Sequence, residues 1–143
     1  MGQINWGRVL LGGIVAGIVL FLAGWLIYGV VLGADLAEMY TSMNRTMDAS
    51  ASTMALYGVL SLVVGLVAIW LYAAARPRFG PGPGTAIRVA LAAWLINSVV
   101  PTMGWIPANL FTNRILGVGL AGDLASMLVA TLIGAWLYKE AGS

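Results

Sequence analysis

Four long apolar stretches constrain the fold of this chain more than any other feature. They run over residues 7–33, 54–75, 86–110 and 116–138. Each reaches the roughly 20 residues that a helix needs to cross a hydrocarbon core about 30 Å thick. In lipid the backbone polar groups must be satisfied inside the protein, and a helix does this within each segment. We therefore predict an all-α fold, a bundle of four transmembrane helices that forms a single integral membrane domain over residues 1–143.

The composition agrees with a membrane environment. Hydrophobic residues make up 61% of the 143 residues and charged residues 8%, whereas soluble domains carry about 25% charged residues. The first apolar stretch is too long and too rich in glycine for a signal peptide, and it lacks a persuasive cleavage site. We expect it to be retained as a membrane helix.

The positive charges predict the orientation of the bundle. Five of the seven Lys and Arg residues lie at the start of the first stretch, in or beside the turn between the second and third, or after the fourth. Cytoplasmic loops of membrane proteins are enriched in these residues. We therefore expect both termini and the central turn, RPRFGPGPG, to face the cytoplasm.

The connection over residues 32–50 is predicted to be an amphipathic extension on the outer side, and its methionines either pack there or bind Cu(I).

The two halves of the chain resemble one another. The dipeptides RV at 8–9 and GW at 24–25 recur at 88–89 and 104–105, an offset of 80 residues. LVVGLVAIWLY and LVATLIGAWLY, at the ends of the second and fourth stretches, match at six of eleven positions.

These matches predict two copies of one helical hairpin, over about 7–75 and 86–139. The copies would be parallel repeats related by a pseudo-two-fold axis along the membrane normal. A chance match between apolar segments is the alternative.

The third stretch is interrupted by prolines and polar residues in NSVVPTMGWIPANLF, residues 97–111. Pro101 has no N–H and crowds the carbonyl four residues earlier, so it is expected to kink the helix and to free the carbonyl of Asn97. The kink is either purely structural or part of a ligand, ion or water site. The candidate residues for such a site are Asn97, Pro101, Thr102, Asn109 and Asp123.

Asp123 has two interpretations. If the glycines at 117, 119 and 122 break the start of the fourth helix, the carboxylate caps the N-terminus of the shorter helix that remains. Otherwise it is a buried carboxylate that faces the broken third helix, and intramembrane acids are often functional.

Small residues form ridges that allow helices to approach closely. They predict helix packing, either within the bundle or against a partner. These residues are Gly13, Gly17, Gly122, Ser126, Ala130 and Gly134.

The chain has no Cys and no His, which excludes disulfides, thiol chemistry and His-based catalysis. Neither a metal constellation nor a nucleophile beside a base is evident, so we predict a protein that is not an enzyme and has no cofactor. The few charges give no basis for nucleic-acid binding.

The predicted function is helix–helix association, with membrane lipids and with itself or another membrane protein as partners, as an oligomer or an accessory subunit. The alternative is a small transporter or channel that uses the broken third helix and Asp123. In INWGRVLLGG at 4–13 and AAWLINSVVPTMGW at 92–105, the chain resembles small uncharacterised four-helix membrane proteins of bacteria. That resemblance implies a bacterial inner-membrane location and no known activity.

Overall fold

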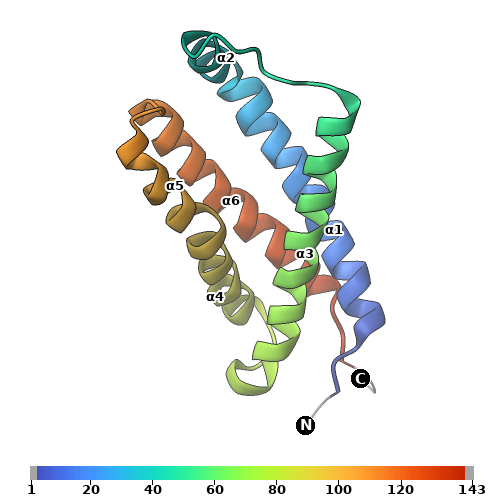
Figure 1. The fold of residues 1–143 in the computed structure, drawn as a ribbon. Coiled ribbons are helices and arrows are strands. Elements are labelled where there is room, and N and C mark those ends of the chain that lie inside the picture. The colour runs from blue at the N-terminus through green and yellow to red at the C-terminus, as the bar shows by residue number, and fades with distance from the viewer. Residues whose placement is uncertain (1–2, 141–143) are drawn as a thin grey trace.

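The structure is a computed structural model that describes residues 3–140. Within this range four helices are long and apolar enough to cross a membrane, which confirms the predicted all-helical fold with four spanning segments (Figure 1). They cover Trp6–Val31, Ala51–Phe79, Pro83–Ala108 and Asn113–Leu137.

Two of the four spans are regular α-helices, and two are interrupted. α3 (Ala51–Phe79) and α6 (Asn113–Leu137) are regular. The first span is α1 (Trp6–Gly24) followed by a π-helical segment, η1 (Trp25–Val31). The third span consists of α4 (Pro83–Trp94), the π-helical η2 (Leu95–Val99), α5 (Val100–Trp105) and the 3₁₀ turn η3 (Ile106–Ala108).

Polar side chains define where three of the spans begin. Asn5, Ser50 and Thr112 precede α1, α3 and α6, and each accepts a hydrogen bond from the backbone N–H three residues later. This is the usual role of an N-cap residue. Because Thr112 caps α6, Asp123 lies well inside this helix, and the prediction that Asp123 caps a shorter helix is wrong.

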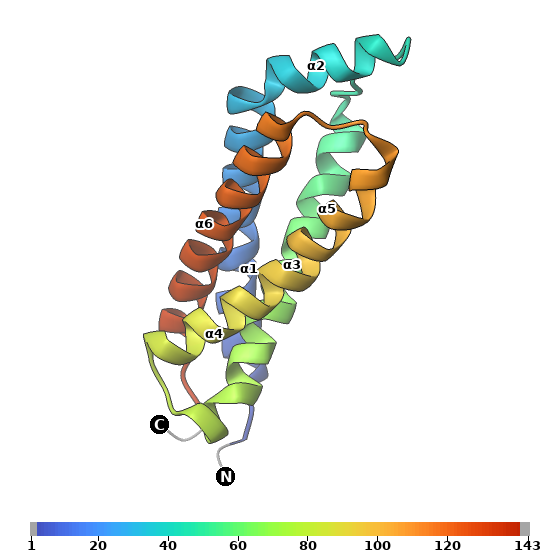
Figure 2. The ribbon, with the colours of Figure 1, turned by 90° about the vertical axis from the view of Figure 1, so that its left-hand side faces the viewer.

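One end of the bundle holds both described chain ends and the α3–α4 connection, and the other holds α2 (Gly33–Ser42) and the α5–α6 connection. We call these the terminal end and the loop end. α2 runs across the loop end at a steep angle to the spans, as expected for an amphipathic segment at an interface (Figure 2).

Close helix contacts concentrate toward the terminal end. α1 packs along α3 and α6, and α4 packs along α6. The backbones nearly touch where glycines meet: a Cβ on Gly65 would lie 2.5 Å from the carbonyl oxygen of Gly13, and a Cβ on Gly134 would lie 2.7 Å from that of Gly12. The ridge residues Gly13, Gly17 and Gly134 therefore make contacts inside the chain.

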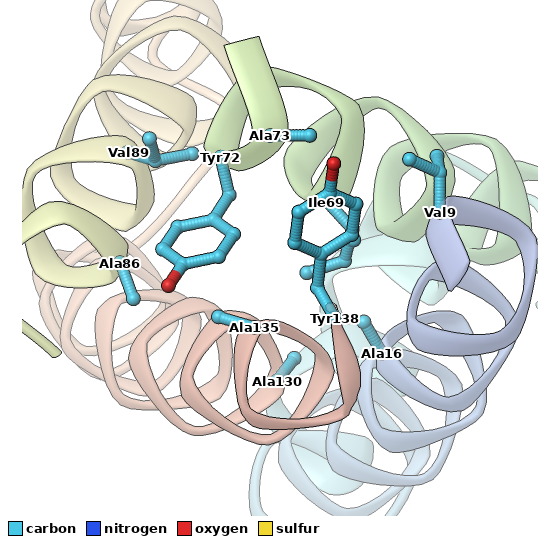
Figure 3. Packing of buried hydrophobic residues seen from close by; sticks show 10 residues of the cluster. All are labelled: Val9, Ala16, Ile69, Tyr72, Ala73, Ala86, Val89, Ala130, Ala135 and Tyr138. Carbon is cyan, nitrogen blue, oxygen red and sulfur yellow. The ribbon is translucent and has the colours of Figure 1, made fainter. Parts of the chain in front are cut away.

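The terminal end is closed by two aromatic rings and one arginine. Tyr72 and Tyr138 meet edge to face with their centroids 6.0 Å apart, within the buried cluster of Figure 3. The guanidinium of Arg76 lies 5.3 Å from the Tyr138 centroid and 5.9 Å from that of Tyr72. Arg76 also pairs with Glu140 at 3.7 Å. These contacts give this half of the bundle a continuous packed core.

Toward the loop end the helices separate. α5 and the loop-end half of α3 diverge in Figure 1, and the main contacts of α3 are with α1, α4 and α6. The bundle is therefore packed most closely in its terminal half, and the candidate cavity lies in the other half.

Candidate ligand-binding cavity

A cavity of about 1060 Å³ occupies the loop-end half of the bundle. Its walls are the end of α1 with η1, the loop-end half of α3, η2, and the middle of α6. The end of α2 and the following segment, residues 40–49, also line it and connect the first two spans across the loop end. We call residues 40–49 the roof of the cavity.

Asp123 forms the polar base of this cavity. Its Oδ2 atom accepts a hydrogen bond of 2.9 Å from the hydroxyl of Tyr28, which comes from η1. The hydroxyl of Ser98, on η2, is a second hydrogen-bonding group beside the same carboxylate. The base therefore joins three spans. A carboxylate has about four lone-pair sites, so the hydrogen bond from Tyr28 leaves it able to accept others.

A smaller cavity of about 200 Å³ adjoins the same group. Tyr28, Asn97, Ser98 and Asp123 line both cavities. These four residues therefore form a polar partition, and we use this name for them below.

The π-helical turn η2 explains how the third span contributes to the partition. The N–H of Val100 bonds to the carbonyl of Leu95, five residues earlier, directly before Pro101. A turn of this kind holds one residue more than an α-helical turn, so residues five apart come toward one face. Asn97 and Thr102, which a regular helix would separate, both line the smaller cavity.

The structure brings together four of the five predicted site residues. Asn97, Pro101, Thr102 and Asp123 all line the smaller cavity. Asn109 does not: it is exposed after η3, with a left-handed backbone at φ 52°. Asparagine tolerates this conformation, so Asn109 belongs to the turn between α5 and α6.

Tyr28 is the site residue that the sequence did not reveal. It lies in a run of apolar residues near a predicted membrane interface, where tyrosine is common. The hydrogen bond joins residues 95 positions apart, and only the pairing of the first and fourth spans creates it. Gly119 makes this possible, because a Cβ there would lie 3.1 Å from the Tyr28 hydroxyl oxygen.

The remaining ridge residues also face the interior of the chain. A Cβ on Gly122 would lie 2.7 Å from a methyl carbon of Ile27. Ala130 is 1% exposed, and Ser126 donates a hydrogen bond of 2.7 Å to the Gly122 carbonyl. The ridge of α6 therefore receives the first span, and Ser126 also lines the larger cavity.

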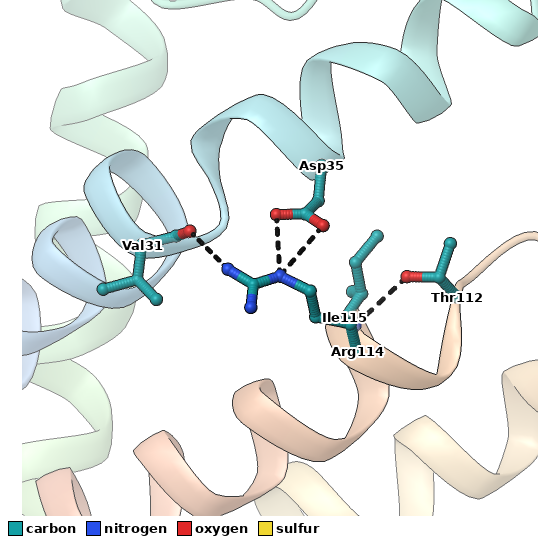
Figure 4. Close-up of polar contacts among 5 residues, drawn as sticks. All are labelled: Val31, Asp35, Thr112, Arg114 and Ile115. Atoms are coloured by element: carbon teal, nitrogen blue, oxygen red, sulfur yellow. Dashed lines mark hydrogen bonds and ion pairs between the residues drawn. The ribbon is translucent and has the colours of Figure 1, made fainter.

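Polar contacts hold the loop end together. Arg114, on α6, pairs with Asp35 at 3.1 Å and donates to the Val31 carbonyl at 3.4 Å (Figure 4).

In the roof, hydrogen bonds from Thr53 and Ser50 hold the pKa of the Asp48 carboxyl below its usual range. Asp48 therefore stays ionised at neutral pH.

Tyr28→Phe should weaken the loop end only modestly. The variant keeps the ring but leaves the Asp123 carboxylate with one donor fewer, and hydrogen bonds between membrane helices average about 0.6 kcal/mol. We expect a loss of about 1 kcal/mol or less in the free energy of unfolding, measured by denaturant titration in mixed micelles. A loss as large as that of a core glycine substitution would show that this bond is the main contact between the first and fourth spans.

No protein-family model, curated protein or solved structure matches this chain.

Proposed function

We propose that this protein binds a small amphiphilic molecule in the larger cavity and acts as a membrane-embedded binding or transport protein. The observation that supports this most strongly is the carboxylate of Asp123 at the base of a cavity of about 1060 Å³ inside the span region. A charged group within a membrane span is costly, and it usually marks a substrate or ion pathway.

The dimensions and lining of the cavity fit a ligand of this kind. Small-molecule sites typically enclose about 300–1,000 Å³ and combine apolar walls with a few polar groups. Here the walls include Phe21, Trp25 and Leu60, and the polar groups gather at the partition.

Lateral entry from the bilayer is part of this proposal. The roof covers the loop end. Trp25, Tyr57 and Leu60 line the cavity and are also exposed at the surface of the bundle, which supports an opening toward the lipid beside α3. An amphiphile dissolved in one leaflet would enter there, with its polar end directed to Asp123.

Association with itself or another protein now has less support than this binding function. The ridges that suggested a partner surface are used within the chain, since Gly13 and Gly17 contact α3 and Gly134 contacts α1. An oligomer built on other surfaces remains compatible with a ligand-binding role.

The proposal also includes the orientation of the protein in the membrane and the relation between its two helical hairpins. The distribution of Lys and Arg supports cytoplasmic termini in a bacterial inner membrane, so that the loop end faces outward. The pairing of α1 with α3 and of α4 with α6 supports two related hairpins, with the broken third span as the copy that diverged to build the partition.

Photolabelling with a neutral amphiphile tests the binding function. Proteoliposomes would be irradiated with an alkanol that carries a diazirine, and adducts would be mapped by mass spectrometry. We expect adducts at Tyr57, Ser61 and Val64, which line the cavity, to be suppressed by an excess of the same alkanol without the diazirine.

The matched control lies on the same helix. Val63 and Val67 are 51% and 47% exposed on the outer surface of the bundle, so their labelling by probe in the lipid should not saturate. If labelling of the cavity face is also unsaturable, or is weaker than at Val63, the proposed binding function is wrong.

A further inference from the structure

We propose that the larger cavity selects a lipophilic organic cation, a molecule with an apolar body and a single positive charge. This inference rests on the proposed function and adds the charge of the ligand. It is argued from the carboxylate of Asp123, which has no positively charged partner among the described residues. This carboxylate lies at the base of a cavity with aromatic walls.

Asp123 lacks a cationic partner within the described part of the chain. The ion pairs between residues 3 and 140 are Arg76–Glu140 and Arg114–Asp35, whereas the neighbours of Asp123 are the hydroxyls of Tyr28 and Ser98. Ionisable groups within membranes generally pair with an opposite charge. A bound cation would supply the charge that the protein itself does not.

The rest of the lining leaves this negative charge uncompensated. Arg45 and Asp48 are the other charged side chains that line the cavity, and both belong to the roof. Their charges offset each other, so the cavity carries the charge of Asp123 at its base. Low-dielectric walls focus the field of such a group and raise the local concentration of counter-ions.

The aromatic lining favours an organic cation over a metal ion. Ca²⁺ requires six to eight oxygen ligands and Mg²⁺ an octahedral set, and one carboxylate with two hydroxyls does not provide these. Aromatic faces attract alkylammonium groups within about 6 Å. The aromatic residues that line the cavity are Phe21, Trp25, Tyr28, Tyr40 and Tyr57.

Competition between matched amphiphiles tests the charge preference. Octyltrimethylammonium, octyl sulfate and octanol have the same alkyl chain and differ in charge. Each would compete with the neutral photolabel at Ser61, with concentrations expressed per bilayer volume. We expect the cation to suppress labelling at a concentration about tenfold or more below that of the sulfate, because the carboxylate attracts one and repels the other.

Asp123→Asn tests whether this carboxylate is the cause. The amide oxygen can still accept the Tyr28 hydrogen bond, so the variant should fold, and a monodisperse elution profile would verify this. We expect its preference for the cation to fall to near unity. Asp35→Asn is the matched control, since Asp35 pairs with Arg114 and does not line the cavity, and it should retain the full preference.

The possible results of these experiments distinguish a failure of the cation inference from a failure of the proposed binding function. Saturable labelling with equal competition by cation and sulfate would overturn the cation inference and leave the binding function standing. Labelling at Ser61 that no competitor suppresses would overturn both. A preference that survives in Asp123→Asn would overturn the assignment to Asp123.

Discussion

Gly65→Leu should prevent the bundle from assembling. A Cβ on Gly65 would lie 2.4 Å from the Gly17 nitrogen and 2.5 Å from the Gly13 carbonyl oxygen, so the new side chain would run into the backbone of α1 at two points. Overpacking of a core typically costs about 1–3 kcal/mol and occasionally more. Because backbone cannot move aside as a side chain can, we expect a loss of more than about 3 kcal/mol, beyond the usual range for overpacking. The variant should be recovered in low yield and as aggregates by size exclusion in detergent.

Gly58→Leu provides the matched control on α3. Nothing lies within 4 Å of a Cβ at Gly58, so this variant should elute as the parent protein does. If Gly65→Leu also folds normally, the close crossing of α1 and α3 is wrong. The same comparison separates a packing effect from the general effect of adding a leucine to a membrane helix.

Single cysteines at the two ends of the bundle should label from opposite sides of the membrane. The chain contains no cysteine, so each introduced thiol is the only one. Thr46→Cys, in the roof, should react with a membrane-impermeant maleimide in intact cells. Arg78→Cys, near the end of α3, should react only after the membrane is permeabilised. We expect nearly complete labelling in one case and background labelling in the other, because the arginines around the α3–α4 connection favour the cytoplasmic side.

The opposite pattern would reverse the orientation and place the cavity in the cytoplasmic leaflet. Labelling of both sites in intact cells would contradict a single orientation. Arg78→Lys keeps the positive charge and serves as a cysteine-free control for expression and insertion.

The spanning helices could be predicted from sequence because the apolar length alone specifies them. The predicted boundaries were less accurate, since α3 continues through Pro77 to Phe79. The glycines near Asp123 misled the prediction for α6. In water glycine favours helix ends, but in a bilayer no solvent competes for the backbone hydrogen bonds, and glycine is common inside spans. Gly119 and Gly122 instead make room for Tyr28 and Ile27.

The candidate site could be predicted only in part. Proline and polar residues mark Asn97, Pro101 and Thr102 as unusual within an apolar run, and the charge marks Asp123. Neither feature specifies that a π-helical turn rotates Asn97 and Thr102 toward one cavity. The contribution of Tyr28 depends on the relative depth of two spans far apart in sequence, which no local pattern encodes.

The thiol reactivity of α3, measured position by position, tests the central claim that a solvent-accessible cavity reaches into the loop-end half of the bundle. Single cysteines would replace Met54, Tyr57, Ser61, Val64 and, further along the helix, Ala68. N-ethylmaleimide reacts with the thiolate, which requires water. The first four positions line the cavity, whereas Ala68 is 1% exposed in the packed half.

We predict fast reaction at the first four positions, slow reaction at the lipid-facing Val63 and Val67, and a sharp loss of reactivity at Ala68. The helical spacing of the reactive positions would identify one wet face of α3 that ends near Val64. Reactivity that falls smoothly with depth, with Ser61→Cys no faster than Val63→Cys, would contradict the cavity and with it the proposed function.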